Sequence, residues 1–151
     1  ILNKSLIWLR SIKEGNKMEN LIEKLNLLWA SKILNYDYDM LLNNITFLLE
    51  TLDNGQIHRY ELKFKKVSMV YFVNNVGDTR FNIFEPDEDD YLEFTSISIL
   101  EDVKFDIESE RDEWLKQYQG KANVCIEIWS KVLLIEADSI ELNNENCSLS
   151  K

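Results

Sequence analysis

One segment of the chain, residues 44–64, reads NITFLLETLDNGQIHRYELKF and has the pattern of a β-hairpin. Its centre is the pair Asn54-Gly55, and these residue types adopt at low cost the positive φ that both positions of a type I′ turn need. A two-residue loop fixes the register, so Asp53 faces Gln56 and each earlier residue faces a later one. The sequence therefore predicts two long antiparallel strands whose pairing is known residue by residue.

The two faces of this hairpin differ in polarity. One face alternates aliphatic and aromatic residues, and it pairs Ile45 with Phe64. The other face is mostly polar and pairs Glu50 with Arg59, which carry opposite charges. A sheet with one buried and one hydrated face explains both strands. The hairpin predicts a fold core and carries no chemistry.

The composition restricts the classes of partner. The chain has 151 residues, which suits one domain. Its formal net charge is -10, and an acidic surface repels both nucleic acid and anionic membranes, so a basic or neutral protein partner is expected. Two cysteines form neither a disulfide framework nor a metal-ligand spacing, which favours reduced thiols and a cytoplasmic location. No apolar run is long enough to span a bilayer.

The first 17 residues differ from the rest because they are basic. They carry Lys4, Arg10, Lys13 and Lys17 against the single acidic residue Glu14. We expect Met18 to be the natural start, residues 1–17 to be translated upstream sequence, and residues 18–151 to form the domain. The alternative is a short basic amphipathic helix over residues 2–12. The intact mass of the protein from its native host tests the first interpretation, and a mass that corresponds to a chain beginning at Ile1 would contradict it.

Two helices are predicted. The first covers residues 20–30, with Asn20 as its cap and an apolar side that packs on the sheet. The second is short and follows Ser109, which precedes a turn of acidic residues, and Trp114 and Tyr118 are expected on its inner side.

Strand patterns fill most of the remaining chain. Residues 67–74 are almost wholly apolar and predict a central strand covered on both faces. A phase change near Thr95-Ser96 predicts a β-bulge, residues 132–142 predict the last strand, and the polar tail from about residue 143 is expected to fray. The predicted class is α+β, with the N-terminal helix packed on a mostly antiparallel sheet that curls or forms two layers. Nothing in the pattern decides between a monomer and a homodimer.

The densest charge run lies in an expected loop that follows Arg80 and Pro86. It consists of Asp87, Glu88, Asp89 and Asp90. Such a loop either solubilises the chain or forms a contact surface for a basic partner. Calcium binding would need the Asp-x-Asp-x-Asp-Gly alternation, which the run lacks. The candidate contact surface also includes Arg80 and Trp129, because Trp129 shares its parity with Cys125 and Glu127 on a less buried strand face.

An enzymatic hypothesis uses two carboxylates and the only histidine. Asp37 and Asp39 share one face of a strand, and His58 lies opposite Thr51 near the hairpin turn. Together they would make a small hydrolase by general acid–base catalysis. A solvated strand face and a hydrogen-bonded histidine at the rim are commoner, so no catalytic residue is assigned.

A carbohydrate-binding module and a metal-binding module are two more hypotheses. Eight aromatic residues could form a sugar platform, although their parity with neighbouring aliphatic residues favours the core for all except Trp129: Trp29, Tyr60, Phe64, Tyr71, Phe72, Trp114, Tyr118 and Trp129. No zinc motif or glycine-rich phosphate loop occurs in the sequence, and no metal or cofactor is expected.

Several short strings resemble the YxiG-like family of small bacterial proteins. They include Tyr60-Glu61-Leu62-Lys63-Phe64, Tyr71-Phe72-Val73-Asn74, Arg80-Phe81-Asn82, Glu127-Ile128-Trp129 and Ile140-Glu141-Leu142, and the likeness spans residues 32–143. None of these strings is a catalytic signature. The resemblance implies a role of the immunity type, because such proteins are often encoded near toxins. The acidic loop from Glu85 to Asp90 departs from the family pattern.

Overall fold

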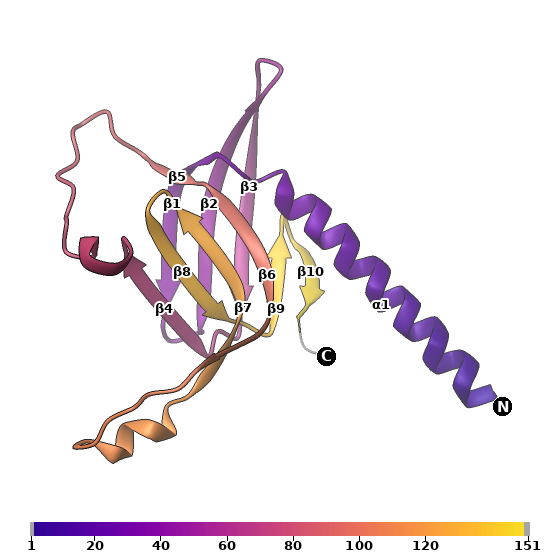
Figure 1. Ribbon diagram of the computed structural model, residues 1–151. Helices are drawn as coiled ribbons and strands as arrows, with labels where there is room; N and C mark the ends of the chain where they lie inside the picture. Colours follow the sequence, from indigo (N-terminus) through magenta and orange to yellow (C-terminus); the bar gives the residue numbers. More distant parts are fainter. Residues whose placement is uncertain (1, 150–151) are drawn as a thin grey trace.

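The computed structural model describes the backbone of residues 2–149, and the side chains of residue 10 and residues 12–149. Two antiparallel sheets lie against each other, and one long helix runs from their edge (Figure 1). The predicted α+β class with two layers is confirmed. The elements in chain order are α1 (Leu2–Asn26), β1 (Ser31–Asp39), β2 (Asn44–Asp53), β3 (Gln56–Lys65), β4 (Met69–Asn74), the 3-10 helix η1 (Gly77–Thr79), β5 (Leu92–Phe94), β6 (Ser96–Phe105), the 3-10 helix η2 (Glu113–Gln117), β7 (Gly120–Ile128), β8 (Lys131–Glu136), β9 (Ser139–Leu142) and β10 (Glu145–Ser148).

The hairpin forms as predicted. Asn54 and Gly55 take φ values of 49° and 77°, and the register of β2 with β3 runs from Asp53 opposite Gln56 to Ile45 opposite Phe64. The predicted charge pair also forms, with Arg59 Nε 3.1 Å from Glu50 Oε2. The local turn therefore determines the pairing of both strands.

The six-stranded sheet has the order β10-β9-β3-β2-β1-β5, and the four-stranded sheet has the order β4-β8-β7-β6. Each sheet turns one face to the other, and these faces form the core. Phe47 packs edge-on against Phe94 from β5 with ring centroids 5.7 Å apart, and both rings are buried. β7 supplies the opposite wall through alternating residues, as its parity predicts: Ala122, Val124, Ile126 and Ile128.

The chain passes between the sheets at positions where the sequence pattern predicts continuous strand. The phase change near Thr95 is such a passage, because β5 belongs to one sheet and β6 to the other. The bulge itself lies later in β6, between Ile99 and Val103. Residues 132–142 likewise form two strands, β8 and β9, in different sheets.

The N-terminal helix is longer than predicted. α1 includes residues 2–12, as the hypothesis of a basic helix states, and it continues to Asn26 without a break at Met18. Asn20 is therefore inside the helix and is not its cap. α1 contacts β6 and β10, and its residues Leu21 and Leu25 are buried, as is Leu28 in the turn that follows the helix. The rest of the helix projects away from the sheets (Figure 1).

Three other predictions need correction. β4 is an edge strand and not a central one, since only β8 pairs with it in the part of the chain that the structure describes. The short helix after Ser109 is the 3-10 helix η2, and Trp114 and Tyr118 are exposed and pack on each other. The tail does not fray at residue 143, because β10 pairs with β9.

Candidate protein-binding surface

The acidic run lies in a long exposed loop between η1 and β5. Asp87, Glu88, Asp89 and Asp90 are all exposed. The run closes on itself, because the Asp87 amide donates to Asp90 Oδ2 at 2.6 Å and the Asp90 amide donates to the Asp87 carbonyl at 3.1 Å. This turn holds four carboxylates in a small exposed region.

Side-chain amides hold the start of the loop. Asn75 Nδ2 donates to the carbonyls of Thr79 and Asn82 at 3.0 and 2.9 Å, and Asn74 Nδ2 donates to the Arg80 carbonyl at 3.1 Å. These bonds satisfy backbone groups that no strand pairs. The loop therefore has a defined base next to the end of β4.

Apolar side chains share the loop with the acidic run. Phe81 is 84% exposed, and Ile83 and Phe84 are exposed as well. The Arg80 guanidinium lies 5.7 Å from the centre of the Phe81 ring. Exposed aromatic groups beside charged ones are typical of a protein-binding surface.

Trp129 lies at the other end of this loop. Its ring centroid is 5.9 Å from that of Tyr91, which follows the acidic run directly, and Lys32 Nζ lies 5.3 Å from the centre of the Tyr91 ring. Trp129 is 44% exposed, as predicted, but it lies in the turn after β7 with a φ of 53° and not on the strand face that its parity indicated. The Trp129 amide donates to Thr95 Oγ1 at 2.9 Å, which fixes the turn after β7. Arg80 and Trp129 thus lie at the two ends of the loop that carries the acidic run.

A pocket of about 340 Å³ opens between the two sheets, at the edge of the molecule where the loop with the acidic run joins β5. Buried residues of β1, β2 and β7 line its inner part: Ile33, Ile45, Phe47 and Ile128. Residues of β1, β4 and β8 surround its mouth: Tyr36, Asp37, Tyr38, Phe72 and Lys131. Tyr36 and Phe72 are 65% and 57% exposed. We call this the edge pocket, and its size falls in the range of about 300–1,000 Å³ that is usual for ligand sites.

The sequence pattern does not predict the edge pocket. Tyr36 and Tyr38 alternate visibly with Asp37, but a one-residue shift between Ile33 and Asn35 decides that both tyrosines turn to the other sheet. The pattern places Phe72 in a covered central strand, whereas β4 is an edge strand. Which strand ends a sheet is not encoded in its own pattern.

The candidate hydrolase residues do not come together. Asp37 faces Thr46, and His58 faces Thr51 further along β2, which places them about 17 Å apart along the strand. Asp39 Oδ1 accepts hydrogen bonds from the amides of Leu41 and Leu42 at 3.0 and 2.9 Å, so it closes the turn after β1. His58 is exposed.

The geometry gives little support to metal binding or to a sugar platform. Among the side chains that the structure describes, no group of three or more His, Cys, Asp or Glu is placed to hold a metal ion. The prediction that most of the aromatic set is core is wrong for five members, which are exposed: Trp29, Tyr71, Phe72, Trp114 and Tyr118. Tyr71 and Phe72 are neighbours in β4, whereas Trp29 precedes β1 and lies in another part of the fold. Of the five, Trp114 and Tyr118 contact each other, edge to face. Phe64 is buried as expected.

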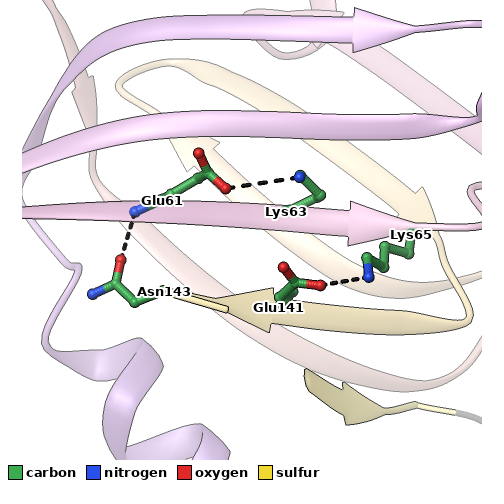
Figure 2. Close-up of polar contacts among 5 residues, drawn as sticks. All are labelled: Glu61, Lys63, Lys65, Glu141 and Asn143. Carbon is green, nitrogen blue, oxygen red and sulfur yellow. Dashed lines mark hydrogen bonds and ion pairs between the residues drawn. The ribbon is translucent and has the colours of Figure 1, made fainter. Parts of the chain in front are cut away.

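The outer face of β3 and β9 is a charged surface with a structural role (Figure 2). Lys65 Nζ lies 2.5 Å from Glu141 Oε2, and this hydrogen bond holds the pKa of Glu141 below its ordinary value. Asn143 Oδ1 accepts from the Glu61 amide at 2.9 Å, which ties the two strands at the turn before β10. Here opposite charges pair within one face.

The two cysteines are free and lie in different sheets. Burial raises the pKa of both thiols, and for Cys125 the nearby Glu127 carboxylate raises it further. A thiol with a raised pKa is a weak nucleophile at neutral pH. Neither cysteine is therefore an activated group.

The fold and this edge surface define a small α+β protein of two antiparallel sheets with an acidic and aromatic face. A family model described as YxiG-like protein matches residues 21–147, and the chain belongs to that family. No curated protein matches the chain. Among the described residues, no helix is both long enough and apolar enough to cross a membrane.

Proposed function

We propose that this YxiG-like protein is a non-enzymatic, cytoplasmic protein-binding module that takes a basic protein partner. The observation that carries the proposal is the loop of residues 80–91, which presents four carboxylates beside exposed Phe81 and Phe84. Long-range attraction would bring a basic partner to this loop, and the aromatic rings would bury apolar area once the partner has docked.

The finer form of the proposal is an immunity role, in which the bound partner is a toxin domain. It draws on the family resemblance and on the net charge of -10, which suits a basic partner. Neutralisation by binding requires surface complementarity and no reacting group. The free thiols are consistent with a reducing compartment.

The experiment uses the protein encoded by the neighbouring gene as the binding probe. Calorimetry compares the wild-type chain with two variants of equal charge change. In the first, Asp87, Glu88, Asp89 and Asp90 become Asn, Gln, Asn and Asn. In the second, which is the control, the exposed residues Asp106, Glu108, Glu110 and Asp112 of the arm between β6 and β7 are changed to their amides in the same way. We expect weaker binding only for the first variant.

A third variant separates binding from hydrolysis. His58→Ala, at an exposed residue outside both proposed contact surfaces, leaves binding and cell protection unchanged if the chain acts by binding alone. Loss of protection with intact binding would favour the hydrolase instead. Equal binding by the loop variant and the control would overturn the role of the acidic loop.

A further inference from the structure

The first part of β1 is paired on both sides, but its second part is paired on one side only. β5 pairs with Ser31, Lys32 and Ile33, and in the described chain no strand lies beside residues 34–39 on that side. The backbone N–H and C=O groups that point outward there have no strand partner, and such an edge is a template for another strand. The edge pocket opens beside this part of β1, since Tyr36, Asp37 and Tyr38 line it.

We propose that this part of β1 and the edge pocket form one site, which takes an extended, basic segment of a partner protein as an added strand. The segment pairs with residues 34–39 and places one large apolar side chain in the pocket. The inference rests on the proposed function for the existence of a protein partner, and it names how that partner is held.

A peptide fits this site better than a free apolar molecule does. The pocket itself is apolar, with Phe47 and Ile45 buried at its inner end, so it favours a hydrocarbon or aromatic group. The strand edge beside it needs hydrogen-bond donors and acceptors at the spacing of a β-strand. Only a chain with a peptide backbone supplies both an apolar anchor and this ladder.

The charges around the site favour a basic segment. Asp37 alternates with Tyr36 and Tyr38, so it lies on the outer face of the same edge strand, where it would stand beside a side chain of the added strand. The acidic run ends at Asp90, two residues before Leu92 of β5, which lines the pocket. The single cation at the mouth, Lys131, donates to Asn74 Oδ1 at 2.8 Å. A second copy of this chain, with net charge -10, would bring two acidic runs to one edge, which costs free energy by repulsion.

The test selects random ten-residue peptides by display against the full chain. We expect the enriched peptides to carry a large apolar residue flanked by Lys or Arg. Phe72→Asp places a charge at the pocket mouth on an exposed side chain, and it should weaken the selected peptides about ten-fold or more. Leu52→Asp is the matched control, because Leu52 is also an exposed apolar strand residue but lies far along β2, and it should leave the affinity unchanged.

A second measurement needs no protein variant. Methylation of alternate backbone nitrogens removes the donors of the peptide, and it should abolish binding to the wild-type chain if the peptide adds as a strand. Equal binding by methylated peptides, equal binding to Phe72→Asp, or no enrichment at all would overturn the inference. Two further results would overturn the inference. If the chain forms a homodimer that displaces the peptides, the occupant is a second copy. If decanoate alone fills the pocket and displaces them, the occupant is a small apolar ligand. These results differ from a failure of the proposed function, in which the peptides still bind but the neighbouring gene product does not.

Discussion

Asn123 holds Ala137 by two hydrogen bonds at the place where the chain leaves one sheet for the other. Asn123 Nδ2 donates to the Ala137 carbonyl at 2.7 Å, and the Ala137 amide donates to Asn123 Oδ1 at 3.0 Å. Ala137 is buried, so neither of its backbone groups has free access to water. The Asn123 side chain, which comes from β7, therefore replaces the strand partner that Ala137 lacks between β8 and β9.

Asn123→Ala should destabilise the fold by about 2–4 kcal/mol, because it leaves two buried backbone groups unsatisfied. Urea unfolding measures the change, and amide hydrogen exchange at Ala137 should become faster. Asn146→Ala, at an exposed residue of β10, is the control and should change little. Equal unfolding midpoints for the two variants would contradict this role.

The aromatic core gives a second prediction. Phe94 is fully buried against Phe47, and Phe94→Ala should lower the free energy of unfolding by about 3–5 kcal/mol through lost burial and the cavity that remains. Phe81→Ala makes the same chemical change at an exposed position of the loop and should stay within about 0.5 kcal/mol of the wild type. Thermal or urea unfolding compares them. A large loss for Phe81→Ala would mean that the loop is packed and not available to a partner.

Glu141 gives a prediction about acid. Its pKa lies below the ordinary value of 4.5, chiefly because Lys65 donates a hydrogen bond to the carboxylate (Figure 2). A lowered folded-state pKa contributes stability that is present above pH 4.5 and is lost as the pH falls through the folded-state pKa. An NMR titration should show the Glu141 pKa rising toward 4.5 in Lys65→Met. Lys116→Met, which removes the partner of exposed Glu113, is the control. An unchanged Glu141 pKa in Lys65→Met would contradict the assignment to Lys65.

The parts of the fold that could be predicted are those determined by neighbours in the chain. Asn54-Gly55 specifies the turn between β2 and β3, and the turn specifies the register of the strands that it joins. Alternation then assigns Val124, Ile126 and Ile128 to the core without reference to any partner strand.

The parts that could not be predicted depend on which strands meet. The phase change near Thr95 indicates a bulge, and the run through Ala137 indicates one strand, yet at both positions the chain changes sheet. Both sheets of a sandwich impose the same period of two, so the pattern does not show to which sheet a strand belongs. The apolar run of β4 indicates a central strand, but β4 is an edge strand, and its exposed Phe72 lies at the mouth of the edge pocket. Asn143-Asn144, with φ values of 47° and 68°, is a hairpin turn between β9 and β10. The sequence after residue 143 is polar and therefore indicates a frayed tail instead of a strand.

We propose that the acidic loop brings a basic protein partner to this edge of the molecule. Stopped-flow association with the neighbouring gene product tests it most directly, with the wild-type chain and the variant in which Asp87, Glu88, Asp89 and Asp90 are neutralised. We expect the variant to associate about ten-fold more slowly at low salt, with little change in dissociation or in stability. The difference should vanish at high salt, because the screening length is about 8 Å at physiological ionic strength and shorter at higher salt. Equal association rates at low salt would contradict the claim and leave the loop as a solubilising turn.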